Sequence, residues 1–357
     1  MLEEDLLLKL KNETEKELSG FFDDKIKQVE KQKKPKEFLE ITKNLKKFVL
    51  SGGKRIRPIL FHCGYFIANG RKKADILKAS ISIELIHSYL LIHDDIIDRD
   101  NFRHNDLSMH CRYEKRYEGF SDYSSQEGNN MKHFGISMAI LAGDFVSSLG
   151  YEILTNSNFP SDLKIKAIKK LNQIISNTIT GEAMDVALAE YPGADMDEVI
   201  KMQRYKTAKY TIEGPLHLGA ILAGADKKFL ESISEFAIPL GIAFQIQDDI
   251  VGVFGNKKRT GKLAGADIKE GKKTLLSIKA FKKANGEQLK ILSESFGNKN
   301  IDRNEIDAVR RIIEETGSLE YSLKRIEDLI RFSKTRLEKM EISEKYKKFL
   351  LRLTTLS

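Results

Sequence analysis

Apolar residues recur three and four positions apart along most of the chain, and no long segment alternates apolar and polar residues. Side chains at those spacings share one face of an α-helix, whereas a strand would alternate at every second position. The pattern therefore predicts an all-α protein. We expect helices, with ends defined to about two to four residues, over 1–28, 37–51, 55–70, 73–99, 134–156, 161–190, 195–224, 226–251, 274–296, 302–316 and 317–341, and in a last segment that runs to the C-terminus.

No linker rich in Pro, Gly or Ser divides this series of helices, so residues 1–357 are predicted to form a single domain. Residues 119–133 are polar and rich in Gly, Ser and Asn, which is typical of a surface-loop insertion. The most apolar run, residues 79–97, contains Glu84, His87 and acids at its end. We interpret it as a helix buried on nearly all sides, and expect no stable insertion into a membrane.

The composition says more about the cellular compartment than about the reaction. Lys and Arg outnumber Asp and Glu by 60 to 52, and this net charge of +8 suits anionic ligands but is also common in soluble proteins. Cys63 and Cys111 are the only cysteines, and the acidic, amphipathic N-terminal segment is unlike a targeting peptide, so a reducing, cytoplasmic setting is expected. The basic run at 31–36 lacks aromatic residues and a basic helix, so no nucleic-acid partner is expected.

The segment LIHDDIIDRD, residues 91–100, places four acids within seven positions at the end of this apolar helix. Asp94 and Asp98 lie one helical turn apart and share a face, with Asp95 beside them. Carboxylates without His or Cys ligands favour Mg²⁺, which usually completes its shell with water and phosphate. Alone, such a cluster could equally be a solvated helix end.

A second long apolar helix, residues 237–255, repeats this layout and ends in Asp248 and Asp249. Two buried helices that end in paired acids predict two facing walls of one cavity, with metal between them. The second cluster is one acid poorer than the first, because Gly252 stands four positions after Asp248.

Basic residues suited to phosphate accompany both acid clusters. The segment SGGKRIRP, 51–58, puts Lys54, Arg55 and Arg57 after a Gly pair at a helix start, where free backbone N–H groups and the helix dipole favour phosphate. Further candidates lie after the first acid cluster, in YKTAKYT, and in the Gly-rich segment 261–274: Arg103, His104, Lys206, Thr207, Lys262, Asp267, Lys272 and Lys273. Acids for metal together with these cations describe a site that binds diphosphates.

These segments make the chain resemble the trans-isoprenyl diphosphate synthases, the family of farnesyl and geranylgeranyl diphosphate synthases. The matching motifs, in the family's order, are GGKRxRP, the Asp-rich DDIID, AILAGD at 139–144, the YKT triplet, FQxxDD at 244–249 and a loop similar to GxDxxEGKKT. The resemblance implies an all-α isoprenoid-synthase helical bundle around a central active-site cavity. It also implies a homodimer that binds isopentenyl diphosphate, an allylic diphosphate and three Mg²⁺ ions per active site.

The resemblance further implies the metal site. The positions that match Mg²⁺ ligands are Asp94, Asp98 and Asp248. The positions that match a supporting shell around them are Asp95, Asp249, Asp267 and Lys272.

The resemblance implies substrate contacts in the same way. The residues that match positions on the diphosphate of isopentenyl diphosphate are Lys54, Arg57, His87 and His104. Those that match positions on the allylic diphosphate are Arg103, Lys206 and Lys262. Thr207 and Gln245 match positions near the reactive carbon, so the expected catalytic set is Lys206, Thr207, Gln245 and Lys262.

The implied reaction is a head-to-tail condensation in which charge stabilisation supports loss of the allylic diphosphate. The double bond of isopentenyl diphosphate then attacks the allylic carbocation, and loss of a proton to the released diphosphate completes the longer chain, so no protein nucleophile is required. Chain length is expected to depend on Tyr89 and Leu90, one turn before Asp94. Similar enzymes that stop at farnesyl diphosphate tend to have aromatic residues at both positions, or one aromatic residue and an insertion in the acid motif. Leu90 is not aromatic and DDIID has no insertion, so the resemblance implies geranylgeranyl diphosphate as the product, with some farnesyl diphosphate released.

Two departures from the family pattern bear on activity. His104 stands where the family usually has a second Arg, so isopentenyl diphosphate is expected to bind less tightly or with pH dependence near the imidazole pKa. Gly252 stands where the family often has a third Asp, at a position peripheral to the metal, so activity is expected to persist.

Four other interpretations account for part of the sequence pattern. A farnesyl diphosphate synthase would share all the motifs and differ in product. A noncatalytic partner subunit usually has damaged Asp-rich motifs, and a terpene cyclase would lack GGKRxRP and FQxxDD. A metal-dependent phosphohydrolase, suggested by His93-Asp94, would need further histidines as ligands and would leave the second acid pair unexplained.

Overall fold

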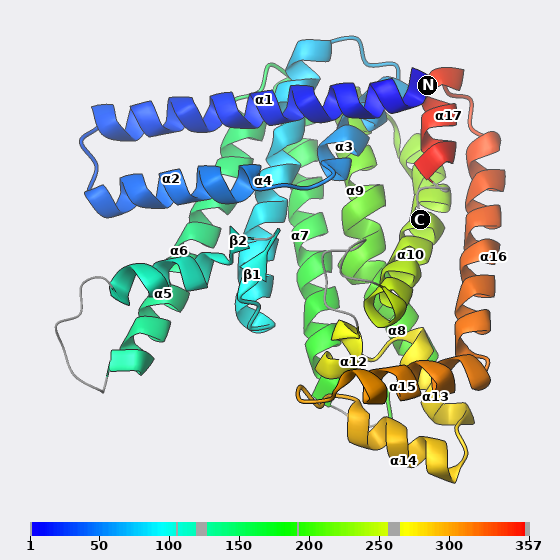
Figure 1. The fold of residues 1–357 in the computed structure, drawn as a ribbon. Coiled ribbons are helices and arrows are strands. Elements are labelled where there is room, and N and C mark those ends of the chain that lie inside the picture. Colours follow the sequence, from blue (N-terminus) through cyan, green and yellow to red (C-terminus); the bar gives the residue numbers. More distant parts are fainter. Residues whose placement is uncertain (1, 105, 119–126, 191–192, 256–264, 354–357) are drawn as a thin grey trace. The chain divides into compact units, whose positions relative to one another are not determined.

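The computed structural model describes residues 2–104, 106–118, 127–190, 193–255 and 265–353. These residues are helical apart from loops and one short antiparallel hairpin, β1 (Phe102–Arg103) and β2 (Asp106–Leu107), so the all-α prediction is confirmed (Figure 1). Most of the predicted insertion at 119–133 lies outside the described residues, and its last part belongs to helix α6 (Glu127–Thr155).

The chain divides into two compact units, which are considered in turn. The first comprises residues 1–171 and 218–224, and the second comprises 172–217 and 225–357. Two of the boundaries fall inside helices α7 (Ser161–Glu190) and α9 (Gly214–Leu222), in agreement with the predicted absence of a linker. The assignment of residues 1–357 to a single domain stays a prediction.

The first unit is built around α4 (Lys73–Ile97). This helix packs against α6 and α3 (Ile56–Ile67), while α1 (Leu2–Lys31) and α2 (Lys36–Leu50) run side by side (Figure 1). Residues 79–86 of α4 are all buried, as the sequence predicted, whereas the last part of the helix up to Ile97 is only partly buried. The remaining helix of this unit, α5 (Met109–Glu118), and the hairpin before it were not predicted.

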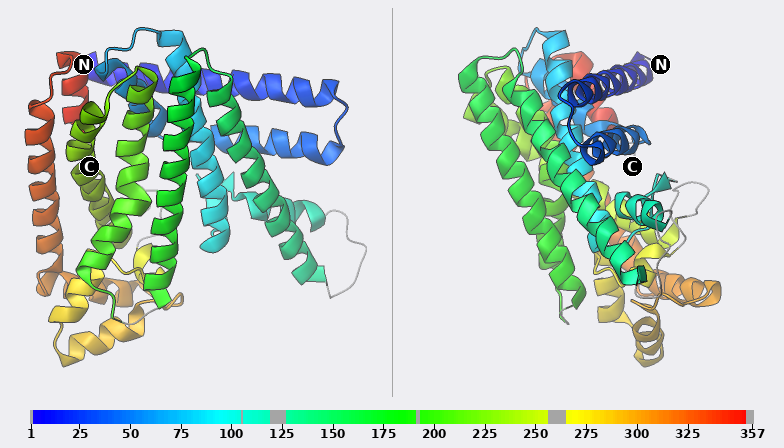
Figure 2. Two further views of the ribbon diagram at one scale, coloured as in Figure 1. Left: turned by 180° about the vertical axis from the view of Figure 1, so that it is seen from behind. Right: turned by 90° about the vertical axis from the view of Figure 1, so that its left-hand side faces the viewer.

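The second unit is built around α10 (Lys227–Phe254), which packs along α16 (Ser318–Glu338), as Figure 1 and the left view of Figure 2 show. Another large contact of α10 is with η1 (Arg204–Glu213), a π-helix between α8 (Met196–Gln203) and α9. The remaining helices of the unit are α12 (Ala266–Glu270), α13 (Leu275–Lys283), α14 (Gly286–Ser295), α15 (Arg303–Glu315) and α17 (Glu344–Leu353).

Two helix predictions in this unit were wrong. The single helix expected over 274–296 is two helices, because Ala284 is extended and Asn285 begins α14 with a capping box to Gln288. The continuous helix expected over 195–224 is interrupted by the π-helical turns of η1, which sequence periodicity does not reveal.

Three helices of the described chain, Lys73–Ile97, Asn130–Thr155 and Lys227–Phe254, have the length and mean hydropathy of a membrane span. In α4, 61% of the most apolar window is buried within the protein. A helix that is apolar on all sides can be either a core helix or a membrane span. The expectation of no membrane insertion therefore stays a prediction.

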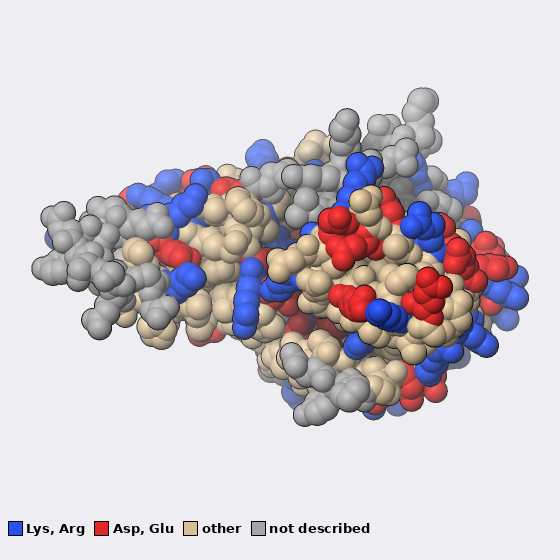
Figure 3. Space-filling model, turned by 60° about the horizontal axis from the view of Figure 1, so that its bottom comes forward, with Lys and Arg blue, Asp and Glu red and all other residues tan. Residues whose placement is uncertain are grey.

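Acidic and basic side chains are interspersed on the face of the molecule shown in Figure 3. Interspersed charge of this kind is typical of a solvated protein surface, whereas a nucleic-acid-binding face usually carries a continuous basic stripe.

Candidate active site

The Gly-Gly segment before α3 is fixed by a buried ion pair. Gly53 (φ 114°) and Arg55 (φ 55°) both have left-handed backbone conformations, and Arg55 is 4% exposed. Its guanidinium donates to Glu84 Oε1 of α4 (2.7 Å) and to the Val49 carbonyl (2.8 Å). Arg55 is therefore a structural residue, and the turn it holds leaves the neighbouring Lys54 exposed.

Arg57 of α3 contacts His87 of α4, with 3.1 Å between Nη1 of Arg57 and Nε2 of His87. A guanidinium can only donate hydrogen bonds, so Nε2 of His87 accepts and its proton is on Nδ1. Burial, together with the positive charges of Arg57 and Arg103, holds the pKa of His87 well below its usual value. His87 is thus a neutral imidazole that orients Arg57, within reach of the charges of both the Gly-Gly segment and the hairpin.

The first acid cluster divides into a buried carboxylate and more accessible ones. Asp95 is fully buried and accepts from Nε of Arg103 at 2.8 Å. Asp94 and Asp100 lie 3.7 and 3.6 Å from the same guanidinium, while Asp98 is exposed at the C-cap of α4. Arg103 therefore lies among the acids and reduces the repulsion between them.

Burial raises the pKa of Asp95 to about 6, against the opposing effect of Arg103. Its Oδ2 is buried and has no hydrogen-bond partner among the described residues. A buried carboxylate oxygen without a donor is costly, and a cation close to this cluster would lower that cost. The cluster therefore fits a hard divalent cation.

His104, in the hairpin turn after Arg103, has a left-handed backbone (φ 50°), and its ring lies against Gly52. Desolvation of the ring, followed by the positive charges of Arg103 and Arg55, lowers the pKa of His104. The lowered pKa agrees with the expectation that His104 lacks the full positive charge that an Arg would carry at this position.

The AILAGD segment of α6 packs against the residues before the first acid cluster. A Cβ on Gly143 would lie 2.3 Å from Cε1 of His93, so only glycine permits this approach. His93 in turn packs edge-on against Tyr89, with 4.8 Å between the rings. Tyr89 packs against the apolar core of the first unit, whereas the half-buried Leu90 is not part of that cluster.

The second acid cluster shows the same division between a buried and an exposed carboxylate. Asp249 is 7% exposed and accepts from Nε2 of Gln203 and Nε2 of Gln245, both at 2.9 Å. Gln245 also accepts from the hydroxyl of Thr207 at 2.6 Å. Asp248, by contrast, is exposed. The structure therefore joins the predicted residues Thr207, Gln245 and Asp249 in one hydrogen-bonded chain.

The π-helix η1 brings Lys206 against two acids of α7 that the sequence analysis missed. Nζ of Lys206 lies 2.9 Å from Oε2 of Glu182 and 2.6 Å from Oδ2 of Asp185. A Cβ on Gly181 would lie 2.2 Å from the Lys206 backbone nitrogen, so the two helices touch there. The signal that could have found these acids is the GEAMD segment, a glycine and two acids within an otherwise mainly apolar stretch.

The Gly-rich segment after α10 is described only in part, because Lys262 lies outside the described residues. Asp267 of α12 is 4% exposed and lies 3.5 Å from Nζ of Lys272, which also pairs with Glu270 at 3.0 Å. Burial lowers the pKa of Lys272, but the carboxylates of Asp267 and Glu270 outweigh burial and raise it. Lys272 is therefore a permanent cation beside the second acid cluster.

No three His, Cys, Asp or Glu side chains converge as a metal-binding group within the described chain. This agrees with the chemistry of Mg²⁺, which is usually held by one or two carboxylates and completed by water and substrate phosphate. The accessible side chains that could supply such carboxylates are Asp94, Asp98 and Asp248.

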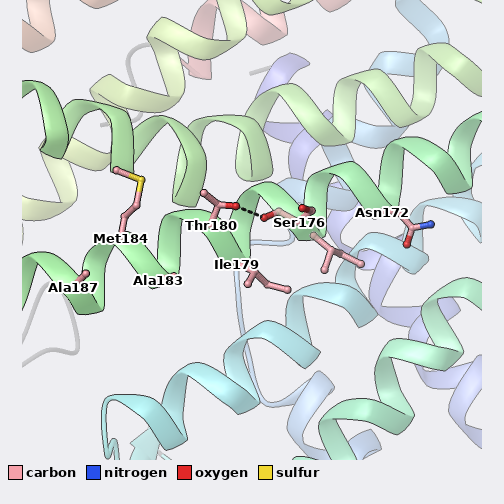
Figure 4. Close-up of a pocket in the computed structure, with 8 residues that line it drawn as sticks. Asn172, Ser176, Ile179, Thr180, Ala183, Met184 and Ala187 are labelled. Carbon is pink, nitrogen blue, oxygen red and sulfur yellow. Dashed lines mark hydrogen bonds between the residues drawn. The ribbon is translucent and has the colours of Figure 1, made fainter.

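An open hollow of about 630 Å³ lies elsewhere, along one face of α7 (Figure 4). Its lining is apolar apart from a few small polar residues, and the hydroxyl of Thr180 donates to the Ser176 carbonyl of the same helix. None of the predicted site residues lines it, so it carries no part of the predicted chemistry.

We expect Asp249→Asn to stabilise the metal-free protein more at pH 8 than at pH 5. Burial, and to a smaller extent the nearby charge of Asp267, raise the pKa of Asp249 from 3.8 to about 7. The folded protein therefore binds this proton more tightly than the unfolded chain, and that advantage is lost as the pH rises through 7. Denaturant unfolding in EDTA should show a gain for Asn that is larger at pH 8 by about 2 kcal/mol.

The exposed Asp197→Asn is the matched control and should show no such difference between the two pH values. An equal gain for Asp249→Asn at pH 5 and pH 8 would contradict a raised pKa at this position.

Known proteins similar to this chain were found at the level of both sequence and structure. The chain is 35% identical over 281 residues to a short chain isoprenyl diphosphate synthase of Methanocaldococcus jannaschii, covering 78% of this chain and 76% of that protein. It is 32% identical over 274 residues to a geranylgeranyl diphosphate synthase of Sulfolobus acidocaldarius, covering 76% of each. A crystal structure of a geranylgeranyl pyrophosphate synthase from Corynebacterium glutamicum, complexed with isoprenyl diphosphate and magnesium, matches with a TM-score of 0.89 at 29% identity and covers 97% of each chain.

The family model described as polyprenyl synthetase matches residues 39–313. This range includes every motif on which the resemblance rested, from the Gly-Gly segment to the loop that contains Asp267 and Lys272. The chain therefore belongs to the polyprenyl synthetase family.

Proposed function

We propose that the chain is a geranylgeranyl diphosphate synthase, which condenses isopentenyl diphosphate with dimethylallyl, geranyl and farnesyl diphosphates. The observation that carries this proposal is the arrangement around His87 and the first acid cluster. There, basic side chains of the Gly-Gly segment and Arg103 surround a neutral imidazole, while one buried and several accessible carboxylates end the same helix. Relatives with this name and membership of the family support it.

The proposed roles follow from charge. Lys54 and Arg57 bind the diphosphate of isopentenyl diphosphate, with Arg57 oriented by His87. Mg²⁺, when bound, neutralises the departing diphosphate, and three ions per active site are proposed with the ligands Asp94, Asp98 and Asp248.

The cationic side chains assigned to the allylic diphosphate are Arg103, Lys206 and Lys262. Each of the two described ones is ion-paired with acids in the structure, so its position is set before a ligand is present. The hydroxyl of Thr207 and the amide of Gln245 present dipoles near the reactive carbon and are not nucleophiles toward it.

Incubation of the protein with labelled isopentenyl diphosphate and each allylic diphosphate, with and without Mg²⁺, tests the function. Mg²⁺-dependent formation of a twenty-carbon diphosphate is expected. Absence of any prenyl product from all three allylic substrates would refute synthase activity and would favour the noncatalytic-subunit interpretation.

Replacing Asp94 or Asp248 with Ala should lower turnover on the order of 10²–10³-fold, the usual effect of losing one electrostatic group at a reacting charge. Both carboxylates are solvent-accessible and lie near other acids, so the melting temperature should change little. Steady-state assays over a range of Mg²⁺ concentrations measure the effect.

Lys78→Ala on α4 and Lys228→Ala on α10 are controls, because both side chains are exposed on the same helices and lie outside the proposed site. Near-normal turnover of either Asp variant would refute the metal assignment.

Removing Lys54 or Arg57 by substitution with Ala should mainly raise KM for isopentenyl diphosphate. A charge-assisted hydrogen bond contributes about 1.5–3 kcal/mol, which corresponds to roughly a tenfold to hundredfold change. Initial rates at saturating allylic substrate measure it, with the exposed Arg71→Ala as control. If only the KM for the allylic substrate rose, Lys54 and Arg57 would bind the allylic diphosphate instead, and the two assignments would have to be exchanged.

Product length is proposed to depend on the α4 residues one turn before Asp94. Leu90→Phe should shift the product toward fifteen carbons, because an aromatic ring there would block the growing chain, and Tyr89→Ala should lengthen it. Since Tyr89 packs in the core, its variant is judged by product ratio and not by rate. Chromatography of the dephosphorylated products measures the ratio. If both variants gave the same product ratio as the unchanged protein, chain length would be set by other residues.

We further propose a cytoplasmic homodimer. Light scattering of the purified protein tests the mass of the particle, and cell fractionation tests the location. A monomeric mass would overturn the proposed homodimer, and recovery in the membrane fraction would overturn the proposed cytoplasmic location.

A further inference from the structure

Gln203, the last residue of α8, is a polar side chain at a core position. The buried residues of this helix are Val199, Met202 and Gln203, spaced as on the inward face of a helix. Gln203 is fully buried, whereas glutamine is mostly exposed in folded proteins. Its Oε1 is buried as well and has no hydrogen-bond partner among the described residues. A buried amide oxygen without a donor is costly, and an apolar side chain would avoid that cost, so the presence of Gln203 needs a physical reason.

The amide nitrogen of Gln203 completes a hydrogen-bonded chain between two helices. Nε2 of Gln203 donates to Oδ2 of Asp249, and Nε2 of Gln245 donates to Oδ1 of the same carboxylate, both at 2.9 Å. Oε1 of Gln245 in turn accepts from the hydroxyl of Thr207 at 2.6 Å. Gln203 and Thr207 lie about one turn apart where α8 passes into η1, and Gln245 and Asp249 lie one turn apart on α10. The two pairs of side chains therefore join the helices at successive turns.

Close packing of η1 against α10 keeps this chain in place. A Cβ on Gly241 would lie 2.5 Å from Cα of Ala208 and 2.7 Å from its Cβ, so the two helices touch one turn before Gln245. The side of α10 that meets η1 therefore carries Gly241, Gln245 and Asp249 at successive turns. The hydrogen bonds continue a contact that the backbones have already made.

The chemistry of these groups fixes the direction of every hydrogen bond. An ionised carboxylate can only accept, so the amides of Gln203 and Gln245 must both turn their NH₂ groups toward Asp249. Gln245 then has only its carbonyl oxygen for Thr207, and the Thr207 hydroxyl must donate. Because that proton is engaged, the hydroxyl presents oxygen lone pairs to any group on its other side. This is the polarity that stabilises a developing positive charge.

We propose that Gln203 is a positioning residue for the condensation: it holds the second oxygen of Asp249 and thereby sets the direction of the Thr207 hydroxyl toward the allylic carbon. This inference rests on the proposed function and deepens it, because it gives control of a catalytic dipole to a residue outside the sequence motifs. Without the Gln203 donor, the carboxylate is free to rotate, and Gln245 and Thr207 lose their fixed polarity.

The test compares Gln203→Met and Gln203→Leu with the unchanged protein at pH 8, above the pKa of about 7 of Asp249. Both replacements have roughly the volume of Gln and no donor, so kcat should fall on the order of tenfold, as after loss of an outer-shell hydrogen bond. The KM for each diphosphate should change less than about twofold, because the lost interaction acts only in the transition state. Stabilisation of the melting temperature by Mg²⁺ with inorganic pyrophosphate should likewise be retained.

Met202→Leu is the matched control. It changes the shape of the neighbouring buried side chain on α8 and removes no hydrogen-bond donor. Its kcat should equal that of the unchanged protein.

A double-mutant cycle with Thr207 separates positioning from packing. Thr207→Val removes the hydroxyl, so Gln203→Met should then cost less than about twofold in kcat, because the group through which it acts is gone. Thr207→Ser keeps a donating hydroxyl, so in that background Gln203→Met should again cost about tenfold. A role in packing alone would give the same loss in both backgrounds.

The inference would be overturned by a normal kcat in both Gln203 variants, by a loss confined to KM or to pyrophosphate binding, or by equal losses in the Thr207→Val and Thr207→Ser backgrounds. Each variant is assayed below its own melting temperature, and Gln203→Leu serves in the cycle if Gln203→Met does not fold. If the unchanged protein forms no prenyl product, the proposed function fails and this inference fails with it. If the unchanged protein is active and the Gln203 variants match it, only this inference fails.

Discussion

The structure depends on carboxylates placed at the ends of apolar helices, where water is partly excluded. Burying a carboxylate is costly unless hydrogen bonds or a cation compensate it. In each acid pair one carboxylate is buried and hydrogen-bonded, and the other is accessible. Asp95 and Asp249 are buried and held by protein donors, a guanidinium for the first and two amides for the second. Asp94 and Asp248 stay accessible, which leaves their charge available to a ligand.

The same constraint explains why the cations are paired before any substrate is present. Arg103, Lys206 and Lys272 each contact acids of their own unit. These contacts fix long, flexible side chains at little cost on ligand binding, because their conformational entropy is already lost in the folded protein. A cation held in this way is a preorganised positive charge, of the kind that stabilises developing negative charge.

Glycine is what allows such groups to approach one another. Gly143 admits the ring of His93, Gly181 admits the backbone at Lys206, and Gly252 admits the carboxylate of Asp267. A methyl group at any of the three would lie well within van der Waals contact of its neighbour. The glycines within these helices therefore mark close packing at the site rather than flexibility.

Periodicity predicted the helices that carry the site, because α4 and α10 have long apolar patterns that end in acids. The ligand types could also be predicted, since carboxylates and cations on one face need no tertiary information. What could not be predicted depends on contacts between distant segments. The backbone hydrogen bonds of the π-helix η1 span five residues instead of the four of an α-helix, and nothing local in YKTAKYT indicates that change. Glu182 and Asp185 belong to the candidate site only through their ion pairs with Lys206, which lies more than twenty residues later in the chain.

Gly252 is another position whose surroundings could not be predicted from the sequence. A motif read along one helix counts only the charges that the helix itself carries, so position 252 looks like a lost acid. Electrostatics depends on how many charges share a volume, whatever segment supplies them. In this structure the Asp267 carboxylate occupies the space where a Cβ at 252 would lie, so its negative charge stands beside α10 although α12 supplies it. The charges that share this volume can therefore be counted only after α10 and α12 have been placed together.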